Sequence, residues 1–313
     1  MEPSPTADLG FGVTRIDAGY VKPGMVSFYL LQCADTYAVI ETGTVHSVPT
    51  LLGLLETLDV QSDQVKYVIP THVHLDHAGG AGLMMQQFTQ AQLVVHPRGS
   101  RHLIDPAKLV AASRQVYGSE LFDRLYGEIV PVPAERVIAA DDGLCLDLAG
   151  RQLLLRHTPG HADHHLCVWD ARSRGWFSGD VFGISYQWFR TNGGDYCMPA
   201  TTPSQFRPQQ LKASIELLAA ESPERIFLTH FGELAYTDEL KQSLLAQIDN
   251  YVKMAGQYGQ QVDQLEEAIM DYSLQRVAAM NTAADTADMR ELFRHDARLN
   301  AQGLAVWQQR QPA

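Results

Sequence analysis

Short runs of apolar and β-branched residues fill the first forty positions of the chain. The runs FGVTRI, SFYLLQC and TYAVI lie between Phe11 and Ile40 and are separated by Gly, Pro and Asp residues. Runs of this kind, bounded by turn residues, predict a meander of antiparallel strands. From Ser47 to Leu58 the leucines recur every three or four positions instead, and this period predicts a helix.

Predicted strands and helices then alternate as far as residue 229. The pattern predicts strands at residues 66–70, 92–96, 137–139, 144–148, 152–157, 165–169, 175–177 and 225–229. It predicts helices at residues 81–88 and 204–220, and a mostly helical stretch at residues 98–127. The order of strands, then helices, then strands thus occurs twice along this part of the chain. We expect an α+β fold in which two sheets pack together with helices outside.

From Thr237 onward no strand pattern remains in the sequence. Residues 238–258, 262–280 and 285–298 each show helical periodicity. The chain is therefore expected to consist of one domain at residues 1–236 and a helical appendage at residues 237–313.

The densest cluster of chemically active residues follows the predicted strand at residues 66–70. The run THVHLDHAGG contains His72, His74, Asp76 and His77. Side chains alternate along an extended backbone, so His72 and His74 are expected to point to the same side. Imidazole nitrogen and carboxylate oxygen are ligands for Zn²⁺, and also for iron and manganese. Buried together without a metal, such groups would cost several kcal/mol, so the run predicts a metal site.

Three further residues of metal-ligand type follow predicted strands in the same way. His161 comes after a Pro-Gly turn that ends one strand, Asp180 closes the sequence FSGD, and His230 closes FLTH. Each residue alone is a weak signal. Together they repeat one arrangement, in which a strand carries a ligand at its C-terminal tip, where open α/β-type folds tend to place sites. The sequence therefore predicts that they join the run in one centre for two metals.

The charge balance counts against a nucleic-acid substrate. The chain has 24 Lys and Arg residues against 36 Asp and Glu, which gives a formal net charge of −12. Nucleic-acid binding relies on cationic surface that neutralises phosphates, and the sequence shows no basic stripe. Arg151, Arg156, Arg172 and Arg174 come nearest to one. We interpret them as residues of a solvated strand edge.

Composition and cysteine spacing indicate the compartment. No apolar run approaches the roughly 18 residues of a membrane span, and the first ten residues lack the basic and then apolar stretch of a signal peptide. The four cysteines are far apart, without a CxxC pair, so buried reduced thiols are expected. We expect a cytoplasmic protein that binds a small molecule, without membrane or nucleic-acid partners. A homodimer is the base-rate expectation for its assembly.

The order HxHxDH, then a distant His, Asp and His, resembles the metallo-β-lactamase superfamily from about residue 11 to residue 236. Within it, THVHLDHAGG, the segment VHPRGSRHLIDP and the run TPGHADHH resemble a branch of uncharacterised hydrolases typified by archaeal proteins. Glyoxalase II and the acyl-homoserine lactonases are more distantly similar. The resemblance implies the αββα sandwich of that superfamily, with the C-terminal helical appendage over the active-site side.

The resemblance also implies a role for each candidate ligand. The first metal would be held by His72, His74 and His161, the second by Asp76, His77 and His230, and Asp180 and a hydroxide would bridge both. Two divalent ions lower the pKa of bound water to about 7. The hydroxide would attack carbon or phosphorus, the second metal would stabilise the oxyanion, and Asp76 would take or deliver a proton. Zinc is the expected metal, and iron and manganese are the alternatives.

Two residues are expected to support the ligands without binding metal. Glu41 stands in Glu-Thr-Gly, where many members of the superfamily have Asp-Thr-Gly, and His165 matches the second histidine of the glyoxalase-like pattern TPGHxxxH. In the aromatic-rich stretch after Asp180, we predict that Tyr186, Trp188 and Tyr196 line the substrate pocket. Packing of that stretch against the C-terminal helices is an equally good interpretation.

An aromatic entrance over a two-metal centre favours hydrolysis of a small ester, lactone or thioester. A phosphodiesterase of the same fold is one alternative, and it would predict basic residues around the entrance. A persulfide dioxygenase with a single iron is another. A protein that holds the metals but only binds an effector is the last. The substrate itself is not determined by these residues.

Overall fold

The computed structural model describes residues 5–191, 194–201, 205–280 and 286–311. The chain divides into two compact units. The sheet unit comprises Met1–His157, His164–Gly179 and Arg225–Glu233, and the helical unit comprises Thr158–Asp163, Asp180–Glu224 and Leu234–Ala313. The expected boundary at residue 236 lies close to the last junction. Residues 158–163 and 180–224, however, group with the C-terminal helices and not with the strands.

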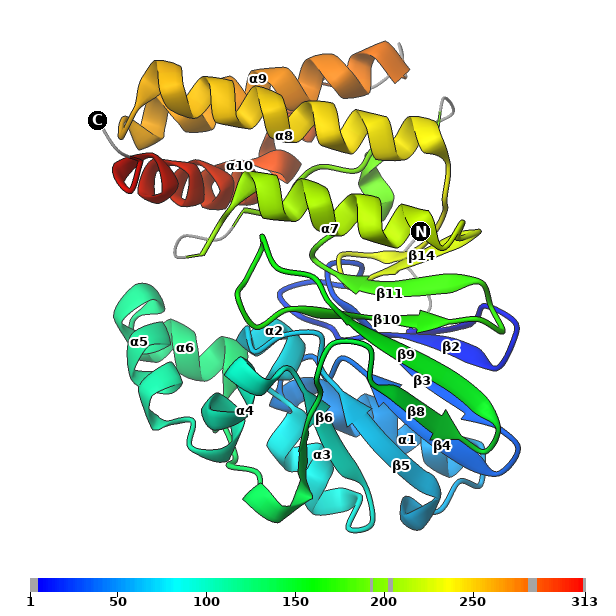
Figure 1. Ribbon diagram of the computed structural model, residues 1–313. Coiled ribbons are helices and arrows are strands. Elements are labelled where there is room, and N and C mark those ends of the chain that lie inside the picture. The colour runs from blue at the N-terminus through cyan, green and yellow to red at the C-terminus, as the bar shows by residue number, and fades with distance from the viewer. Residues whose placement is uncertain (1–4, 192–193, 202–204, 281–285, 312–313) are drawn as a thin grey trace. The chain divides into compact units, whose positions relative to one another are not determined.

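The first sheet of the sheet unit has the strand order β1-β2-β3-β4-β5-β6-β7, and Figure 1 labels its strands β2 to β6. Its strands are Thr6–Asp8 (β1), Val13–Asp17 (β2), Ser27–Cys33 (β3), Thr36–Ile40 (β4), Val65–Ile69 (β5), Gln92–Val95 (β6) and Val137–Ala139 (β7). The strands β1 to β4 pair antiparallel, as the predicted meander requires. The strands β4 to β7 pair parallel. Parallel neighbours need a crossover, which α1 (Val48–Thr57) and α3 (Ala81–Gln87) supply on either side of β5.

The second sheet has the order β15-β14-β11-β10-β9-β8. Its strands are Cys145–Leu148 (β8), Arg151–His157 (β9), Leu166–Asp170 (β10), Gly175–Gly179 (β11), Arg225–Leu228 (β14) and Gly232–Ala235 (β15). The strands β8 to β11 form an antiparallel meander, and β14 runs parallel to β11. The sequence does not predict β15, because its four residues, GELA, show no run of β-branched side chains.

The two sheets pack face to face through one apolar core. Leu31 and Ile40 of the first sheet and Leu155 of the second have no exposed surface, and burying one such side chain contributes roughly 1.5–3 kcal/mol. The ring of Tyr29 lies 5.1 Å from that of Phe177 between centroids. These contacts hold the C-terminal ends of the central strands of both sheets at fixed positions.

The helices of the sheet unit follow the parallel strands. α3 packs against β5 and β6, and α4 (Pro97–Ile104) packs against β7. The expected helical stretch at residues 98–127 is divided into α4, α5 (Ala107–Tyr117) and α6 (Ser119–Tyr126). Pro106 has no amide hydrogen with which to continue α4. Gly118, with a φ of +76°, ends α5 in a conformation that favours glycine.

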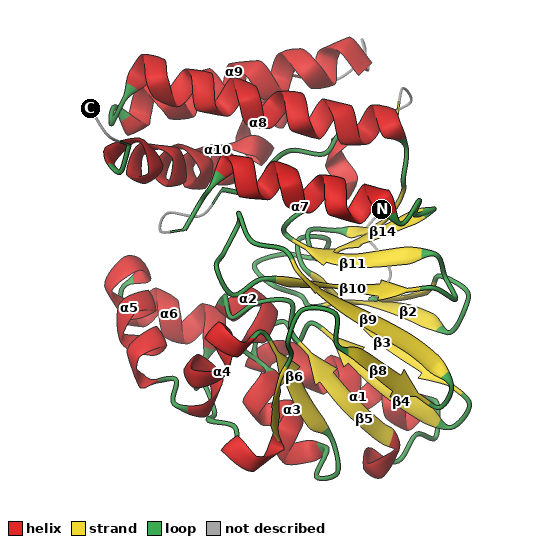
Figure 2. Ribbon diagram, viewed as in Figure 1, coloured by secondary structure: helices red, strands yellow, loops and turns green. Residues whose placement is uncertain are grey.

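The helical unit contains α7 (Pro208–Ala220), α8 (Asp238–Tyr258), α9 (Val262–Met280) and α10 (Thr286–Gln309). They pack side by side, α7 on α8 and α8 to α10 on one another (Figure 2). The unit also contains two short strands, Arg190–Thr191 (β12) and Gly194–Asp195 (β13). The expected first residues of two helices, Ser204 and Asp285, lie outside the described residues. None of the described helices is both long and apolar enough to cross a membrane.

Aromatic packing explains why the segment after residue 180 belongs to the helical unit. The ring of Phe189 stacks on that of Phe293 with 4.2 Å between centroids. The amide of Thr201 donates a hydrogen bond of 2.7 Å to the side chain of Asn300. Both partners lie on α10, so this segment shares a core with the C-terminal helices.

The interpretation of Arg151 as a solvated edge residue is wrong. Arg151 is 4% exposed. Its Nε and Nη2 donate to the two carboxylate oxygens of Asp170 at 2.9 and 2.6 Å, and its Nη1 donates to the carbonyls of Phe11 and Gln32 at 3.0 Å each. Arg151 therefore ties the second sheet to the turn before β2 and to β3 of the first sheet. Arg172 and Arg174 are exposed, as expected.

Replacement of Asp170 by Asn should destabilise the fold strongly. Burial raises the pKa of Asp170, but hydrogen bonds from Arg151 and Ser173 outweigh burial and hold the pKa below its ordinary value. The ionised carboxylate therefore stabilises the fold above pH ~4, and this contribution is lost as the pH falls through the folded-state pKa. Asp170→Asn leaves the Arg151 charge buried and uncompensated, which should cost about 3–5 kcal/mol in urea unfolding at pH 7.

The matched control is Asp123→Asn. Asp123 pairs with Arg114 at the surface, where an ion pair contributes about 0–1 kcal/mol. Equal small losses in the two variants would contradict the structural role of the Arg151–Asp170 pair.

Candidate metal centre

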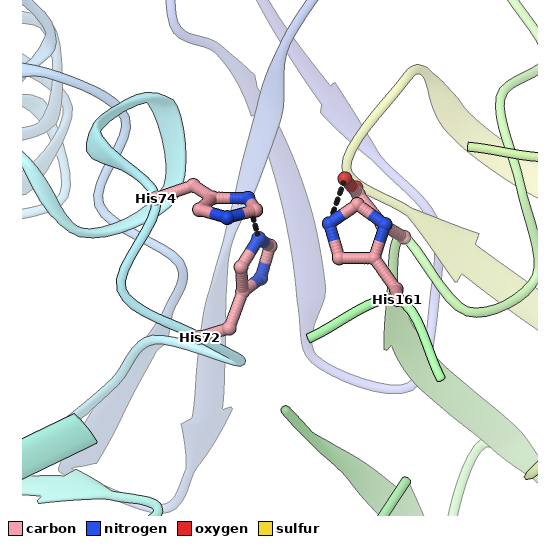
Figure 3. Close-up of side chains that lie close together, drawn as sticks. His72, His74 and His161 are labelled. Carbon is pink, nitrogen blue, oxygen red and sulfur yellow. Dashed lines mark hydrogen bonds and ion pairs between the residues drawn. The ribbon is translucent and has the colours of Figure 1, made fainter. Parts of the chain in front are cut away.

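The predicted histidine pair follows β5 on extended backbone. β5 ends at Ile69, and His72 and His74 come after it. His72 Nε2 and His74 Nδ1 lie 2.7 Å apart, and the two rings meet edge to face (Figure 3). The two side chains thus point to the same side, as the alternation along extended chain requires.

Asp76 and His77 lie on α2 (Leu75–Ala78), a short helix that the sequence pattern does not predict. Gly80 follows the helix with a φ of −81°, so it is not required by a left-handed backbone. A Cβ there would lie 2.7 Å from the carbonyl oxygen of Thr42. The glycine is needed because the two segments approach closely, and this approach brings α2 to the end of β4.

The carboxylate of Asp76 faces two imidazoles. Its Oδ2 lies 3.6 Å from Nε2 of His77 and 3.4 Å from Nε2 of His230, which follows β14. Ligand atoms bound to one tetrahedral zinc at about 2.05 Å are separated by roughly 3.3 Å. The separations around Asp76 are therefore those of a closely spaced donor set, and the ligand atoms of all three residues lie within 4.8 Å of one another.

The other nitrogen of each imidazole is held by an oxygen. His77 Nδ1 lies 2.9 Å from Glu41 Oε1, and His230 Nδ1 lies 3.0 Å from the carbonyl of Met25. Because a carbonyl and a carboxylate can only accept, the neutral rings carry their hydrogen on Nδ1 and have a lone pair on Nε2. Two lone pairs directed at a carboxylate repel it unless a positive charge lies among them. The donor set therefore fits a divalent cation.

The electrostatics at Asp76 favour its charged form. Burial raises the pKa of the Asp76 carboxyl, but without a bound cation the positive charges of His77, His230 and His74, when these rings are protonated, and a hydrogen bond from His230 outweigh burial. The pKa is held well below its ordinary value, so Asp76 is ionised at neutral pH. A bound cation would act in the same direction.

Glu41 accepts the hydrogen bonds that orient the candidate ligands of the sheet unit. The side chain is 1% exposed and follows β4. Its Oε1 accepts hydrogen bonds from Thr71 Oγ1 at 2.5 Å and from Thr229 Oγ1 at 2.9 Å, and its Oε2 accepts from the Thr71 amide at 2.9 Å. Since Thr71 Oγ1 donates to Glu41, it is left as an acceptor for Nδ1 of His72 at 3.1 Å. Glu41 thus orients His77 directly and His72 through Thr71.

The helical unit holds the remaining pair of predicted ligands, His161 and Asp180. His161 Nδ1 lies 3.0 Å from the carbonyl of Ala200, and its Nε2 lies 3.1 Å from Asp180 Oδ2. Figure 3 shows the imidazole of His161 with one of its interactions dashed. Both side chains are buried. The pattern is the one seen at His77 and His230: an oxygen fixes Nδ1, and Nε2 faces a carboxylate.

His165 lies beside the ligands of the sheet unit. It has no exposed surface, and its ring stacks on that of His72 with 4.9 Å between centroids. The neighbouring His164 is also buried, and its Nδ1 accepts a hydrogen bond from the Val73 amide at 3.5 Å. Both imidazoles therefore pack against the run at residues 72–77.

The residues expected to line a substrate pocket belong to the helical unit. Tyr186 and Tyr196 are buried, and their hydroxyls bind Asp296 at 3.3 Å and Gln247 at 2.9 Å. Trp188 is half-buried and stacks on Tyr186 with 4.7 Å between centroids. Packing against the C-terminal helices accounts for both tyrosines. Their pocket role stays a prediction.

Several residues that shape the site are not predicted from the sequence. Thr71 and Thr229 each directly precede a candidate ligand histidine, and the carbonyls of Met25 and Ala200 orient the candidate ligands His230 and His161. Backbone carbonyls carry no residue-specific signal. The position before the ligand is the single feature that could have marked the threonines.

The described residues of the sheet unit contain two groups that could hold a metal ion, Asp76/His77/His230 and Glu41/His72/His77. The model of the Metallo-beta-lactamase superfamily matches residues 21–230, more than half of the chain. The chain belongs to this superfamily. The predicted metallo-β-lactamase fold, α+β with C-terminal helices, is thereby confirmed.

This metallo-β-lactamase superfamily member is similar to several known chains. The metallo-beta-lactamase fold-containing protein ST1585 of Sulfurisphaera tokodaii is 26% identical over 244 residues, covering 74% of this chain and 84% of that protein. The acyl-coenzyme A thioesterase MBLAC2 of Gallus gallus is 25% identical over 268 residues, covering 79% and 86%. The crystal structure of the family protein TTHA1429 from Thermus thermophilus has a TM-score of 0.65 at 20% identity, covering 96% and 94%.

Replacement of Glu41 by Gln should weaken metal binding. The amide of Gln cannot accept all the hydrogen bonds that the carboxylate accepts, so His77 and Thr71 lose their orientation. Loss of such an outer partner typically costs 10- to 100-fold in metal affinity. Competition with a chromophoric chelator measures this affinity, and Glu56→Gln, at an exposed position of α1, is the control. An unchanged metal affinity in Glu41→Gln would show that Glu41 does not orient the ligands.

Proposed function

We propose that this metallo-β-lactamase superfamily member is a metal-dependent hydrolase that cleaves a thioester, small ester or lactone, with a thioester as the leading substrate class. One observation carries the hydrolase assignment. The Asp76 carboxylate faces the Nε2 atoms of His77 and His230 at 3.6 and 3.4 Å, and both rings are fixed through Nδ1. Such a preorganised donor set serves to hold a cation.

The proposed centre holds two divalent ions. Its ligands are His72, His74, Asp76, His77, His161, Asp180 and His230. His161 and Asp180 repeat the geometry around Asp76: an oxygen fixes Nδ1 of the imidazole, and Nε2 faces a carboxylate. Two such pairings of a carboxylate with an oriented imidazole support a site for two ions. Zinc fits the nitrogen and oxygen donors, as do iron and manganese. Two bound ions would supply Lewis acidity and make hydroxide available at neutral pH.

The residues of the chain have distinct tasks in this proposal. The imidazoles stay neutral and oriented because their Nδ1 hydrogens are engaged by oxygens. Asp76 is ionised at neutral pH, which a ligand requires. We assign Asp76 the further task of passing a proton from the attacking water to the departing thiolate or alkoxide, because one carboxylate oxygen is available while the other faces His77 and His230.

Two observations support an ester or thioester over a phosphodiester. The formal net charge of −12 counts against nucleic acid as the phosphodiester, because nucleic-acid binding relies on cationic surface. The similar protein from Gallus gallus is an acyl-coenzyme A thioesterase by name and matches 79% of this chain. A thioester also has a good leaving group, and its carbonyl carbon is open to attack by hydroxide.

Metal analysis and a substrate panel test the proposal. Protein purified without chelator should contain close to two divalent ions per chain, and should hydrolyse thioesters faster than bis-p-nitrophenyl phosphate. Turnover should disappear in His74→Ala and on dialysis against a chelator, and return with added zinc. A single tightly bound iron with oxygen consumption would overturn the two-metal proposal. Turnover of the phosphodiester far above that of thioesters would replace the proposed substrate class.

Replacement of Asp76 by Asn should remove both a ligand and a proton carrier. The side-chain volume is kept, while the charge and the proton affinity are lost. A positioned acid–base group contributes typically 10²- to 10⁴-fold, so kcat/KM should fall at least a hundredfold by this estimate. The control is Asp63→Asn, at an exposed site before β5. Activity of Asp76→Asn within about threefold of the control would exclude both roles.

A further inference from the structure

Three tyrosines from separate segments meet beside the candidate centre, all within the sheet unit. Tyr20 lies in the turn between β2 and β3, Tyr117 ends α5 and Tyr126 ends α6. The hydroxyls of Tyr20 and Tyr126 are 2.9 Å apart. The rings of Tyr117 and Tyr126 are 5.5 Å apart between centroids and meet edge to face. We name these three residues the tyrosine cluster.

The tyrosine cluster packs on the helix that carries Asp76. Leu75, the first residue of α2, is 4% exposed and forms one apolar group with Phe122 and Tyr126, against which Tyr20 and Tyr117 also pack. α2 accordingly lies beside α6 in Figure 1. The loop of Tyr20 continues to Met25, whose carbonyl orients His230. The cluster is thus tied to two candidate ligands, Asp76 and His230.

The hydroxyls of the cluster stay protonated in the working pH range. Burial, and then the negative charge of Asp76, raise the pKa of Tyr20 and of Tyr126 far above the ordinary value. Burial and Asp76 also raise the pKa of Tyr117. The cluster therefore offers neutral O–H groups at the edge of an anionic carboxylate. Arg114, which lies over the Phe122 ring, is itself paired with Asp123.

A count of hydrogens shows what the tyrosine cluster can do. The three hydroxyls of the cluster carry three hydrogens, and the bonds of Tyr126 to Tyr20 and to Tyr117 use two of them. The third remains to be donated to an acceptor outside the cluster. Tyr126 is 3% exposed, whereas Tyr20 is half-buried. When Tyr126 donates to Tyr20, the outward hydrogen belongs to the more accessible Tyr20.

We propose that Tyr20 donates a hydrogen bond to an uncharged oxygen in the leaving-group half of the substrate, with Tyr126 as a positioning residue. This inference rests on the proposed hydrolase function, because the proton from Asp76 goes to the leaving group and the tyrosine cluster lies beside Asp76. It narrows the substrate to one whose thiol or alcohol half bears an ether, hydroxyl or amide oxygen.

A pair of thioesters of equal shape tests the inference. S-(2-methoxyethyl) thioacetate and S-butyl thioacetate share the acetyl group and differ by one oxygen in place of a methylene. A hydrogen bond to a neutral acceptor contributes roughly 1 kcal/mol, about fivefold in affinity. Tyr20→Phe should therefore lower kcat/KM for the methoxyethyl substrate about fivefold, through KM, and change that for the butyl substrate less than about twofold by the same estimate.

Two further variants separate contact from structure. Tyr126→Phe should lower kcat/KM for the methoxyethyl substrate less than Tyr20→Phe does, because Tyr20 keeps its own hydroxyl. Tyr258→Phe, at the end of α8, is the control and should change neither substrate. The loss in Tyr20→Phe should be constant from pH 6 to pH 9, since the hydroxyl stays neutral throughout.

The possible results distinguish the role of Tyr20 from the proposed hydrolase function. Equal losses for both thioesters in Tyr20→Phe, or none for either, would overturn the role of Tyr20 and leave the hydrolase standing. Wild-type protein loaded with metal that hydrolyses neither thioester would overturn the proposed thioesterase function, and the inference with it.

Discussion

The arrangement of the candidate ligands in the sheet unit depends on the hydrogen bonds of one buried carboxylate, that of Glu41. This carboxylate lies where β4, β5 and β14 end, and it accepts hydrogen bonds from Thr71 and Thr229 and from the imidazole of His77. Glu41 itself has a φ of +63°, a conformation that costs a non-glycine residue about 1–2 kcal/mol. The four hydrogen bonds offset that cost because a buried carboxylate gains more from each donor than a neutral acceptor does. Strand ends from both sheets are thereby fixed to one point.

This arrangement explains why the candidate ligands fall at strand tips. The core between the sheets, with Tyr29, Phe177 and Phe227 in ring contact, sets where each strand ends. The residues beyond the tips leave the apolar layer and can present polar side chains to one another. Fixing each imidazole through Nδ1 then needs a single acceptor, and backbone carbonyls such as those of Met25 and Ala200 provide it. The rigid strands and these short hydrogen bonds to Nδ1 together fix the orientation of the imidazoles before a metal binds.

The sequence is informative about the ligands because their chemistry limits the residue types that can serve. Most residues of the run at 72–77 are histidine or aspartate, and the strand before the run, β5, has the expected apolar pattern. Arg151 shows the limit: it has the same local pattern as an exposed strand arginine, and its burial follows from a turn and a strand more than a hundred residues away. Residues 98–127 divide into three helices at Pro106 and Gly118. The periodic pattern of apolar residues alone did not predict these two breaks. The grouping of residues 180–224 with the C-terminal helices arises from ring contacts such as Phe189 on Phe293, which no local pattern contains.

The charge arrangement links the ligands to the tyrosine cluster. In the proposed centre, Asp76, Asp180 and Glu41 carry three negative charges and two divalent ions would carry four positive ones, so a hydroxide is attracted while the surroundings stay nearly neutral. The tyrosine cluster packs with Leu75, which precedes Asp76 on α2, and the charge of Asp76 raises the pKa of Tyr20 and of Tyr126. A phenol beside a carboxylate stays a donor, whereas a lysine or arginine there would compete with the metal for Asp76. Neutral donors are therefore the side chains that can bind substrate at this edge without weakening the metal site.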